Sequence, residues 1–417
     1  MDYENRNGKE AQSGGGKRAL VLSGGGSRGA YQCGVWQAME ELGMGIDIVA
    51  GVSVGAINGA MVVQGDVIKT ANLWRQMETS MVFDVDADAG IADFAAEFLK
   101  GGGAGSVGLQ SMLSEYVDEE AIRRSPTDFG LLTVEFPSMK PHYLWKEDIP
   151  RGQLCDYITA SASAFPAVKP FDIEGKDYID GGYENNLPAA MALEKGAAEV
   201  ICVYLDAIGR FRPSSLKDIP NLTFIESKWD LGDFLVFDRA NSKRILRLGY
   251  LDAMKTFGVY DGGYYTFAKG TFDRRALAQA DRAARIFELD PLILYRHGSF
   301  ESALSSAVAA ARAEAAPLHA AEDRPVHTDE GGGLSMLSVS ALPVSALPVS
   351  ALSNLSKGGL SSVIGQLKSA SRKAATLFIA DSLRERGGES VFLSRYARRL
   401  LKDEVSAARL LVKLGLA

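Results

Sequence analysis

Apolar residues in the first sixty positions follow a pattern that predicts two successive strand–helix units. Residues 18–22 (RALVL) form an apolar run that ends in the glycine-rich stretch 23–29 (SGGGSRG), and residues 30–42 then carry apolar side chains at helical spacing. A second apolar run at 46–50 leads through a short turn at 51–55 into residues 56–62, which again show helical spacing. Uninterrupted apolar runs are typical of parallel strands that are buried on both faces. This order predicts the opening of a wound α/β sheet.

Later segments predict further strands of the same sheet. Residues 168–180 predict a β-hairpin, because VKPFDI and DYID flank a turn at 174–176. Residues 199–205 (EVICVYL) predict one more buried strand, which would complete the sheet. The other elements predicted in this part are a helix that ends over 73–81, strands at 131–136 and 143–145, and a helix at 154–163.

The character of the chain changes after about residue 206, where helical spacing dominates. Apolar residues recur at helical intervals over 241–257, 275–287 and 301–315, and two more helices are predicted at 362–383 and 391–414. Between them the repeat VSALPVSALPVSAL cannot build a packed core. We therefore divide the chain into a disordered N-terminus (1–16), an α/β domain (17–207), a helical extension associated with it (208–325), a low-complexity linker (326–357) and a basic helical tail (358–417).

Composition is that of an ordinary globular protein, but the charge is uneven. Of the 417 residues, 47% are hydrophobic and 23% are charged, and the formal net charge is −7. From residue 361 onward 11 basic residues stand against 5 acidic ones, so the tail carries +6 and the rest of the chain −13. Such a tail favours contact with an anionic partner or with the chain's own body. No segment has the pattern of a signal peptide or a membrane span, so we expect a cytoplasmic protein without a nucleic-acid partner.

The cysteines carry no pattern for metal binding or redox chemistry. Cys33, Cys155 and Cys202 lie in apolar settings and are expected to be core residues. No calcium-loop pattern occurs either, so neither a metal nor a cofactor is expected.

Ser53 is the first candidate for chemistry. It is the central residue of a G-x-S-x-G pattern, with Gly51 and Gly55 on either side, between a predicted strand and a predicted helix. In that setting a sharp turn holds the hydroxyl out of the fold at a helix N-terminus, as a nucleophile requires. A helix-capping serine would give the same local pattern, and these residues alone leave the two interpretations open.

The glycine-rich loop before it is the second candidate. We interpret Gly24, Gly25 and Gly26, with Arg28 and Gly29, as an oxyanion hole whose N–H groups would face a developing negative charge. The alternative is a nucleotide-binding loop, but the spacing is neither G-x-G-x-x-G nor that of a P-loop. For Arg28 we expect hydrogen bonds to carbonyl groups that hold the loop in shape, with contact to a phosphate head group as the alternative.

Asp180 is the third candidate, because the predicted hairpin delivers Asp180-Gly181-Gly182 at a strand end. By itself this triplet would more often be a turn. The glycine loop, the serine elbow and the Asp-Gly-Gly triplet together, in this order, resemble the patatin-like phospholipases over residues 17–207, about half of the chain. The resemblance implies a patatin-like wound sheet with three α/β/α layers, followed here by a mostly helical C-terminal extension.

The resemblance also implies hydrolysis of phospholipid or lysophospholipid esters by a Ser–Asp dyad. Ser53 would attack the ester carbonyl and form an acyl-enzyme, and Asp180 would act as the general base without help from a histidine. Two alternatives stay open: a lipid-binding or signalling protein of this fold without turnover, and an esterase or thioesterase that acts on soluble acyl substrates. The head group, the acyl position, the chain length, an activator and the oligomeric state are not determined by the sequence.

A histidine-dependent triad is the alternative mechanism, and His297 is its candidate because a Ser, Asp, His order would place the base there. His142, His319 and His327 are expected to be ordinary loop or surface residues.

Two segments have alternative roles beside the site. Residues 84–108 are acidic and glycine-rich, and we weigh a flap over the active site against a surface helix with loops. The predicted helix 362–383 has Leu377 and Phe378 on its apolar face and Arg372 and Lys373 towards the other. It would either lie on an anionic membrane, which would make the protein peripheral there, or pack against the protein itself.

Overall fold

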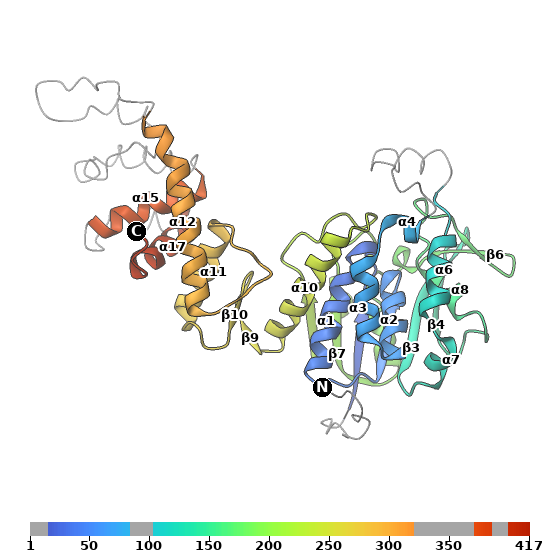
Figure 1. Ribbon diagram of the computed structural model, residues 1–417. Helices are drawn as coiled ribbons and strands as arrows, with labels where there is room; N and C mark the ends of the chain where they lie inside the picture. The colour runs from blue at the N-terminus through green and yellow to red at the C-terminus, as the bar shows by residue number, and fades with distance from the viewer. Residues whose placement is uncertain (1–15, 84–102, 321–370, 386–398) are drawn as a thin grey trace, which may run out of the picture. The chain divides into compact units, whose positions relative to one another are not determined.

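The fold is described by a computed structural model that covers residues 16–83, 103–320, 371–385 and 399–417 (Figure 1). It divides into two compact units, Met1–Phe257 and Gly258–Ala417. The first unit is built on an eight-stranded sheet in the order β5-β6-β3-β2-β1-β7-β8, with β4 paired to β3. Its strands are β1 (Lys17–Leu22), β2 (Ile48–Val52), β3 (Asp128–Phe136), β4 (Lys140–Trp145), β5 (Phe171–Ile173), β6 (Lys176–Asp180), β7 (Ala197–Tyr204) and β8 (Leu222–Glu226).

Strand direction divides this sheet into two parts. The strands β3, β2, β1, β7 and β8 are parallel to their neighbours in that order. The pairs β3–β4, β3–β6 and β5–β6 are antiparallel, so the predicted hairpin at 168–180 is confirmed as β5 and β6. The apolar runs of β1 and β2 are parallel, as their lack of alternation predicts.

Helices cover both faces of the sheet, which confirms the predicted α/β layers. Ile48 belongs to a core cluster with Ala189 and Ala192 of α9, whereas its neighbour Val49 contacts α2 at Gly59. The helices of this unit are α1 (Gly29–Glu41), α2 (Val54–Gln64), α3 (Val67–Gln76), α4 (Thr79–Val82), α6 (Val107–Tyr116), α7 (Glu119–Arg124), α8 (Leu154–Ser161), α9 (Ala189–Glu194) and α10 (Arg239–Thr256), with 3₁₀ turns η1 (Gly26–Arg28), η2 (Gly181–Tyr183) and η3 (Pro213–Leu216).

Two glycines bring α1 and α10 into backbone contact. A Cβ atom on Gly34 would lie 1.9 Å from the carbonyl oxygen of Leu246, and one on Gly249 would lie 2.1 Å from that of Tyr31. Such an approach leaves no room for a side chain, so α10 packs directly on α1. The first compact unit therefore includes residues 208–257, which the sequence assigned to the extension, and β8 continues the sheet beyond the strand expected to complete it.

The second unit combines helices with a small sheet, whose strands the sequence did not predict within the mostly helical extension. Here β10 (Thr266–Ala268) pairs with β9 (Tyr260–Asp261) and with β11 (Leu294–Tyr295). Phe300 is fully buried against Phe267 and Phe272 in an aromatic cluster. The helices are α11 (Arg274–Ile286), α12 (His297–Ala320), α15 (Arg372–Glu385) and α17 (Lys402–Lys413). No helix of the described part is long and apolar enough to cross a membrane.

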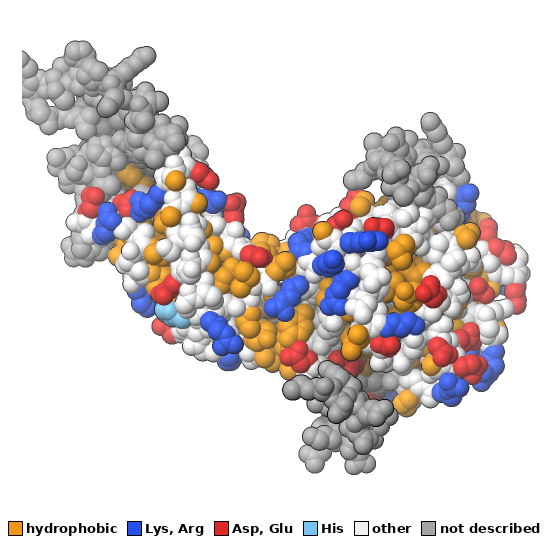
Figure 2. Space-filling model, viewed as in Figure 1, with side chains coloured by type: hydrophobic (Ala, Val, Ile, Leu, Met, Phe, Trp, Pro, Cys, Tyr) orange, Lys and Arg blue, Asp and Glu red, His pale blue; other side chains and the backbone are white. Residues whose placement is uncertain are grey.

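The tail helix α15 buries the face that could have lain on a membrane. Leu377 and Phe378 are only 6% and 8% exposed. Arg372 forms ion pairs with Asp403 and Glu404, and Lys373 pairs with Glu288. Figure 2 likewise shows acidic and basic side chains interspersed over this unit. The structure therefore favours the packing alternative for the described part of the tail.

Several predicted segments lie outside the described residues. They are residues 1–15 of the N-terminus, 84–102 of the acidic segment, 321–370, which contain the low-complexity linker, and 386–398.

Candidate active site

Ser53 occupies a strained turn between β2 and α2. Its backbone has φ 57° and ψ −129°, a region that residues other than glycine rarely adopt. Its side chain makes no capping hydrogen bond to the helix, so the capping interpretation is wrong. The turn needs both flanking glycines: a Cβ on Gly51 would lie 2.2 Å from the carbonyl oxygen of Gly55, and one on Gly55 would lie 2.2 Å from that of Leu22.

The backbone of the turn is held by a serine that sequence reasoning missed. The N–H of Ser53 donates to Oγ of Ser161 at 2.9 Å, and this hydroxyl donates to the carbonyl of Leu132 at 2.7 Å. Ser161 is fully buried near the end of α8. Its only sequence signal was its place in a run of small residues, which does not separate it from its neighbours.

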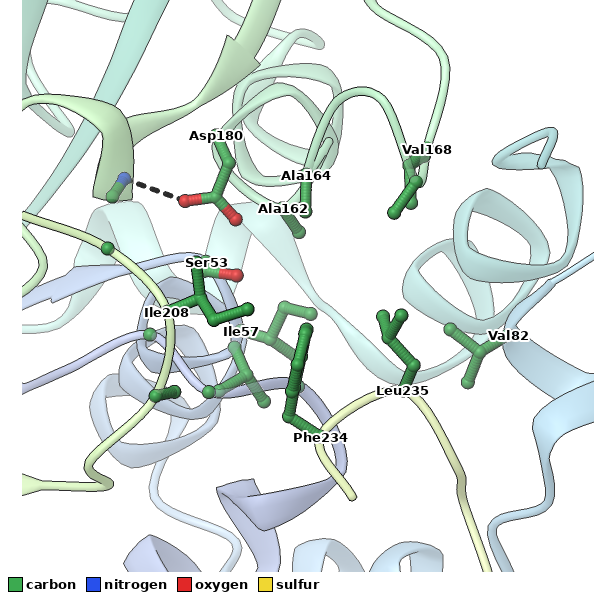
Figure 3. Close-up of a pocket in the computed structure, with 18 of the residues that line it drawn as sticks. Ser53, Ile57, Val82, Ala162, Ala164, Val168, Asp180, Ile208, Phe234 and Leu235 are labelled. Atoms are coloured by element: carbon green, nitrogen blue, oxygen red, sulfur yellow. Dashed lines mark hydrogen bonds between the residues drawn. The ribbon is translucent and has the colours of Figure 1, made fainter. Parts of the chain in front are cut away.

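Sheet register brings Asp180 to Ser53. Val52 pairs with Leu132 of β3, and Asp180 pairs with the next residue, Thr133. The end of β2 and the end of β6 are thus held at consecutive positions of one strand. Oδ1 of Asp180 accepts a hydrogen bond from the N–H of Gly182 at 2.7 Å. In Figure 3 the other carboxylate oxygen is directed towards the hydroxyl of Ser53.

Burial changes the acidity of Asp180. Removal from water raises the pKa of its carboxyl group to about 6, while hydrogen bonds from the Ser53 hydroxyl and the Gly182 N–H act in the opposite direction. The carboxylate is still mostly ionised at neutral pH, yet it is a stronger base than an ordinary aspartate.

The glycine loop lies beside Ser53, and its members have different roles. Gly24 donates its N–H to the carbonyl of Asn186 at 3.3 Å, so this group is already engaged. Within the described residues no hydrogen bond uses the N–H of Gly25 or Gly26, and both residues line the cavity next to Ser53. Gly26 has φ 54°, and a Cβ there would lie 2.0 Å from the carbonyl oxygen of Phe234. Gly25 and Gly26 are therefore the two free donors of the loop.

Arg28 and Gly29 follow the three glycines of the loop and support it away from the cavity. The Arg28 side chain donates to the carbonyl oxygens of Gly232 at 2.8 Å, Leu205 at 3.2 Å and Asp206 at 2.5 Å. These bonds fit the predicted role of holding carbonyl groups. Gly29 begins α1, where a Cβ would meet Val54 and Trp74. Neither residue lines the cavity.

A cavity of about 540 Å³ opens from Ser53 and Asp180. Its polar end is formed by the glycine loop, Gly182, Asn186 and Arg210. In Figure 3 Ser53 and Asp180 lie at one side of the view and Val82 at the other, with Leu235 and Val168 between them. Side chains of this apolar arm come from the helices α2, α3, α4 and α6 and from loops, and include Ile57, Trp74, Met77, Val82, Phe83, Leu109, Met112, Phe165, Val168, Phe234, Leu235 and Phe237.

Asn186, which is not among the site residues named from the sequence, also lines the cavity. It is 1% exposed, and its Nδ2 has no hydrogen-bond partner among the described residues. A Cβ on Gly24 would lie 2.4 Å from its Oδ1 and 3.1 Å from Cβ of Ser53. The amide of Asn186 therefore lies close to the turn that carries Ser53.

Among the described residues, no histidine lines the cavity. His297 lies in the second unit, where it faces Glu301 at 3.4 Å, and His142 lies on β4 at 3.3 Å from Glu135. Across the described residues, no group of three His, Cys, Asp or Glu side chains is arranged as a metal site.

Comparison with known proteins adds a family and two relatives. Residues 20–193 match the family model described as patatin-like phospholipase. Patatin-like phospholipase domain-containing protein 7 of Rattus norvegicus is 30% identical over 194 residues, which cover 44% of this chain and 13% of that protein. Lysophospholipase NTE1 of Mycosarcoma maydis is 27% identical over 216 residues, which cover 48% of this chain and 10% of that protein.

Among solved structures, VipD from Legionella pneumophila aligns with a TM-score of 0.39 and 13% sequence identity, over 96% of this chain and 92% of that one. The chain spans only about a tenth of the length of the curated relatives named above.

Proposed function

We propose, from the match of residues 20–193 to the patatin-like phospholipase model, that the protein is a serine acyl hydrolase that cleaves phospholipid or lysophospholipid esters. The observation that carries the proposal is the pairing of a serine in a strained turn with a buried aspartate, both of which line one largely apolar cavity. The relatives' names agree with such chemistry, since they are called phospholipase and lysophospholipase.

The reaction begins with proton transfer from Ser53 to Asp180. Oγ of Ser53 attacks the ester carbonyl while its proton passes to the free carboxylate oxygen of Asp180. The leaving alcohol takes that proton when the tetrahedral intermediate collapses to an acyl-enzyme. Water then attacks the acyl-enzyme, Asp180 again accepts and returns one proton, and the fatty acid leaves. The raised pKa of Asp180, about 6, supports this role because it brings the base closer to neutral pH.

The glycine loop stabilises the oxyanion of both intermediates. Gly25 and Gly26 have N–H groups that no described residue occupies, and they lie beside Ser53. The N-terminus of α2, which begins directly after Ser53, adds its positive end. Removal of one donor of this kind from an oxyanion hole slows catalysis about 100- to 1,000-fold.

The cavity supports a long acyl chain as the bound group. An apolar cavity of 150 Å³ holds benzene, so by proportion about 540 Å³ holds on the order of 20 carbon atoms. The polar end of the cavity, with Asn186 and Arg210, would then hold the head group or glycerol moiety, on the side of Ser53 opposite to the apolar arm.

The test is hydrolysis of a fluorogenic phospholipid in vesicles without calcium. We expect turnover by the wild type and a loss of at least about 1,000-fold in Ser53→Ala and Asp180→Asn. Asp177→Asn is the matched control, because Asp177 is an exposed residue of the same strand. Full activity in folded Asp180→Asn would overturn the role of Asp180.

Two other outcomes would redirect the proposal. Hydrolysis of soluble esters or thioesters at rates that vesicles do not raise would favour the soluble-substrate alternative. Binding of lipid by a wild type that hydrolyses no ester would favour the binding protein.

A further inference from the structure

A buried polar network joins the serine helix, the glycine loop and the wall of the cavity. Asn58 Oδ1 accepts a hydrogen bond from Trp74 Nε1 at 3.0 Å. Asn58 Nδ2 donates to the carbonyl of Gly29 and to Oε1 of Gln32, both at 2.9 Å. Gln32 Nε2 donates to the carbonyl of Ser23 at 2.7 Å. The side chains of Asn58, Gln32 and Trp74 are all buried, at 3%, 1% and 2% exposure.

Bonding chemistry fixes the orientation of both amides. The indole of Trp74 can only donate, so the atom of Asn58 that faces it must be the oxygen. The two hydrogens of Nδ2 then meet two acceptors, the Gly29 carbonyl and Gln32 Oε1. Gln32 is oriented in turn, because its nitrogen must face the Ser23 carbonyl. An inverted Asn58 amide would place donor against donor and acceptor against acceptor.

Hydrogen bonds of this network hold the glycine loop at both of its ends. Ser23 immediately precedes Gly24, and Gly29 follows Arg28 at the start of α1. Three consecutive glycines have little conformational preference of their own, so the loop's shape depends on such anchors. Asn58 lies on α2 five residues after Ser53, which makes it rigid relative to the nucleophile.

Other contacts of the loop lead elsewhere. Arg28 and Gly24 hold it to residues 186, 205, 206 and 232, which are outside the serine helix. Within the described residues, the hydrogen bonds from a side chain of α2 to the loop segment run through Asn58.

We propose that Asn58 is a positioning residue, which rests on the proposed function: it sets the distance between the glycine loop and Ser53. Through Gly29 directly and Ser23 by way of Gln32, it aims the N–H groups of Gly25 and Gly26 at the oxyanion. The hydrogen bond from Trp74 fixes the orientation of the Asn58 amide, and Trp74 also lines the apolar arm of the cavity. The wall of this arm and the glycine loop are therefore joined by one hydrogen-bond network.

The sharpest variant is Asn58→Asp. It keeps the oxygen that accepts from Trp74 but places a second oxygen against the Gly29 carbonyl and Gln32 Oε1, which repels the loop. Asn72→Asp makes the same chemical change at an exposed position of α3 and is the matched control.

Each variant is assayed for kcat and KM on a soluble butyryl ester, inhibition by an alkyl trifluoromethyl ketone, and palmitic acid binding. Oγ of Ser53 adds to the carbonyl carbon of the ketone, which forms an oxyanion that the glycine loop must stabilise. Palmitic acid forms no oxyanion of this kind, so its binding depends only on the cavity. We expect Asn58→Asp to lower kcat and ketone affinity about 100-fold, as misplacement by roughly 1 Å does, with KM and palmitic acid affinity within about twofold.

Three results would overturn the inference. They are unchanged kcat in folded Asn58→Asp, a parallel fall of palmitic acid affinity, and an equal effect in Asn72→Asp. If Asn58→Asp does not fold, Gln32→Met carries the test. It removes the two hydrogen bonds that connect Asn58 to Ser23 through Gln32 but keeps the bond from Asn58 to Gly29, so it should lower kcat and ketone affinity in the same direction by a smaller factor. A wild type that neither hydrolyses esters nor binds the ketone would overturn the proposed function, and this inference with it.

Discussion

The two compact units use buried and half-buried polar groups in different ways. Around Ser53 the first unit buries uncharged donors, such as Asn58 and Ser161, and satisfies them with backbone carbonyls. It also buries one carboxyl group, that of Asp180, whose charge is disfavoured there. The second unit instead joins its helices by partly exposed ion pairs, such as Arg282–Asp403 and Arg312–Asp381.

The difference separates groups that serve chemistry from groups that serve assembly. A positive φ at Ser53 costs on the order of 1–3 kcal/mol, and the buried charge of Asp180 adds to that cost. Neither the positive φ of Ser53 nor the buried charge of Asp180 stabilises the fold, so we explain both by the proposed catalytic roles of these two residues. The ion pairs of the second unit are common surface chemistry and each stabilises the unit slightly. Changes around Ser53 should therefore alter activity, and removal of the Asp180 charge should raise stability while it abolishes activity. Changes in the second unit should alter stability alone.

The largest effect is expected from Gly55→Ala. The new Cβ would lie 2.2 Å from the carbonyl oxygen of Leu22 and 2.7 Å from that of Ser23, and backbone atoms cannot move aside. We expect a loss of about 3 kcal/mol or more in unfolding free energy and no measurable hydrolysis. Gly298→Ala in the second unit is the control, since nothing lies within 4 Å of its Cβ. Urea denaturation measures the unfolding free energy of both variants. A Gly55→Ala variant as stable as the wild type would contradict the close packing of Gly55 against the carbonyl groups of Leu22 and Ser23.

Asp180→Asn should be inactive yet more stable than the wild type at neutral pH. Folding raises the pKa of Asp180 from 3.8 to about 6, so the folded state binds the extra proton between these values. The stability linked to this group is thus fully present below pH 3.8 and is lost as pH rises through about 6. The total loss is about 3 kcal/mol, which the uncharged amide avoids.

Denaturation of both proteins from pH 4 to pH 8 measures this difference. We expect it to grow with pH and level off above about pH 7. A variant less stable than the wild type at pH 8 would mean that the carboxylate is stabilised in the fold. In the same range, kcat/KM of the wild type should rise as pH passes through about 6 and level off above about pH 7, because the base must be ionised.

Val82→Trp should shorten the acyl chain that the enzyme accepts. Val82 lines the arm of the cavity far from Ser53 and is 5% exposed, so an indole there fills space that only long chains reach. We expect kcat/KM for a palmitoyl ester to fall about 10- to 100-fold relative to that for a butyryl ester. In the second unit, Val308→Trp changes an equally buried valine and should lower stability without changing this ratio. An unchanged ratio in Val82→Trp would place the chain elsewhere.

The smallest effect is expected from Asp381→Asn. Asp381 accepts from Arg312 at 2.8 Å, but the two side chains are 22% and 39% exposed, so water and salt screen the pair. We expect a loss below about 1 kcal/mol that shrinks further in high salt, and an unchanged specific activity. Thermal unfolding at two salt concentrations measures it. A loss of several kcal/mol would mean that this unit, too, depends on a buried charge.

Local signals allowed the sequence to predict most of the first unit. The strand–loop–helix order of residues 17–62 follows from apolar periodicity and from glycines that mark sharp turns, and both act within a few residues. The elements β5 and β6 follow from their turn in the same way. Ser53, Asp180 and the loop glycines could be named because each stands in a short pattern with a defined local geometry.

Errors arose where packing rather than pattern sets the outcome. Residues 208–257 belong to the first unit because Gly34 and Gly249 let α10 lie on α1, and no local signal links positions so far apart. The strands β9 to β11 are two or three residues long, too short for periodicity to detect. The apolar face of α15 fitted a membrane or a protein core equally well until its neighbours were known.

The sequence by itself supplied the candidate residues to which we assign the chemistry; the tertiary structure decided how they meet. Ser53 and Asp180 lie side by side because β2 and β6 pair with consecutive residues of β3, a register that depends on the whole sheet. The pKa of Asp180, the two free N–H groups of the loop and the network through Asn58 likewise depend on atoms from distant segments. Burial and hydrogen bonding are sums over all neighbours in space, and a linear pattern records only the neighbours in the chain.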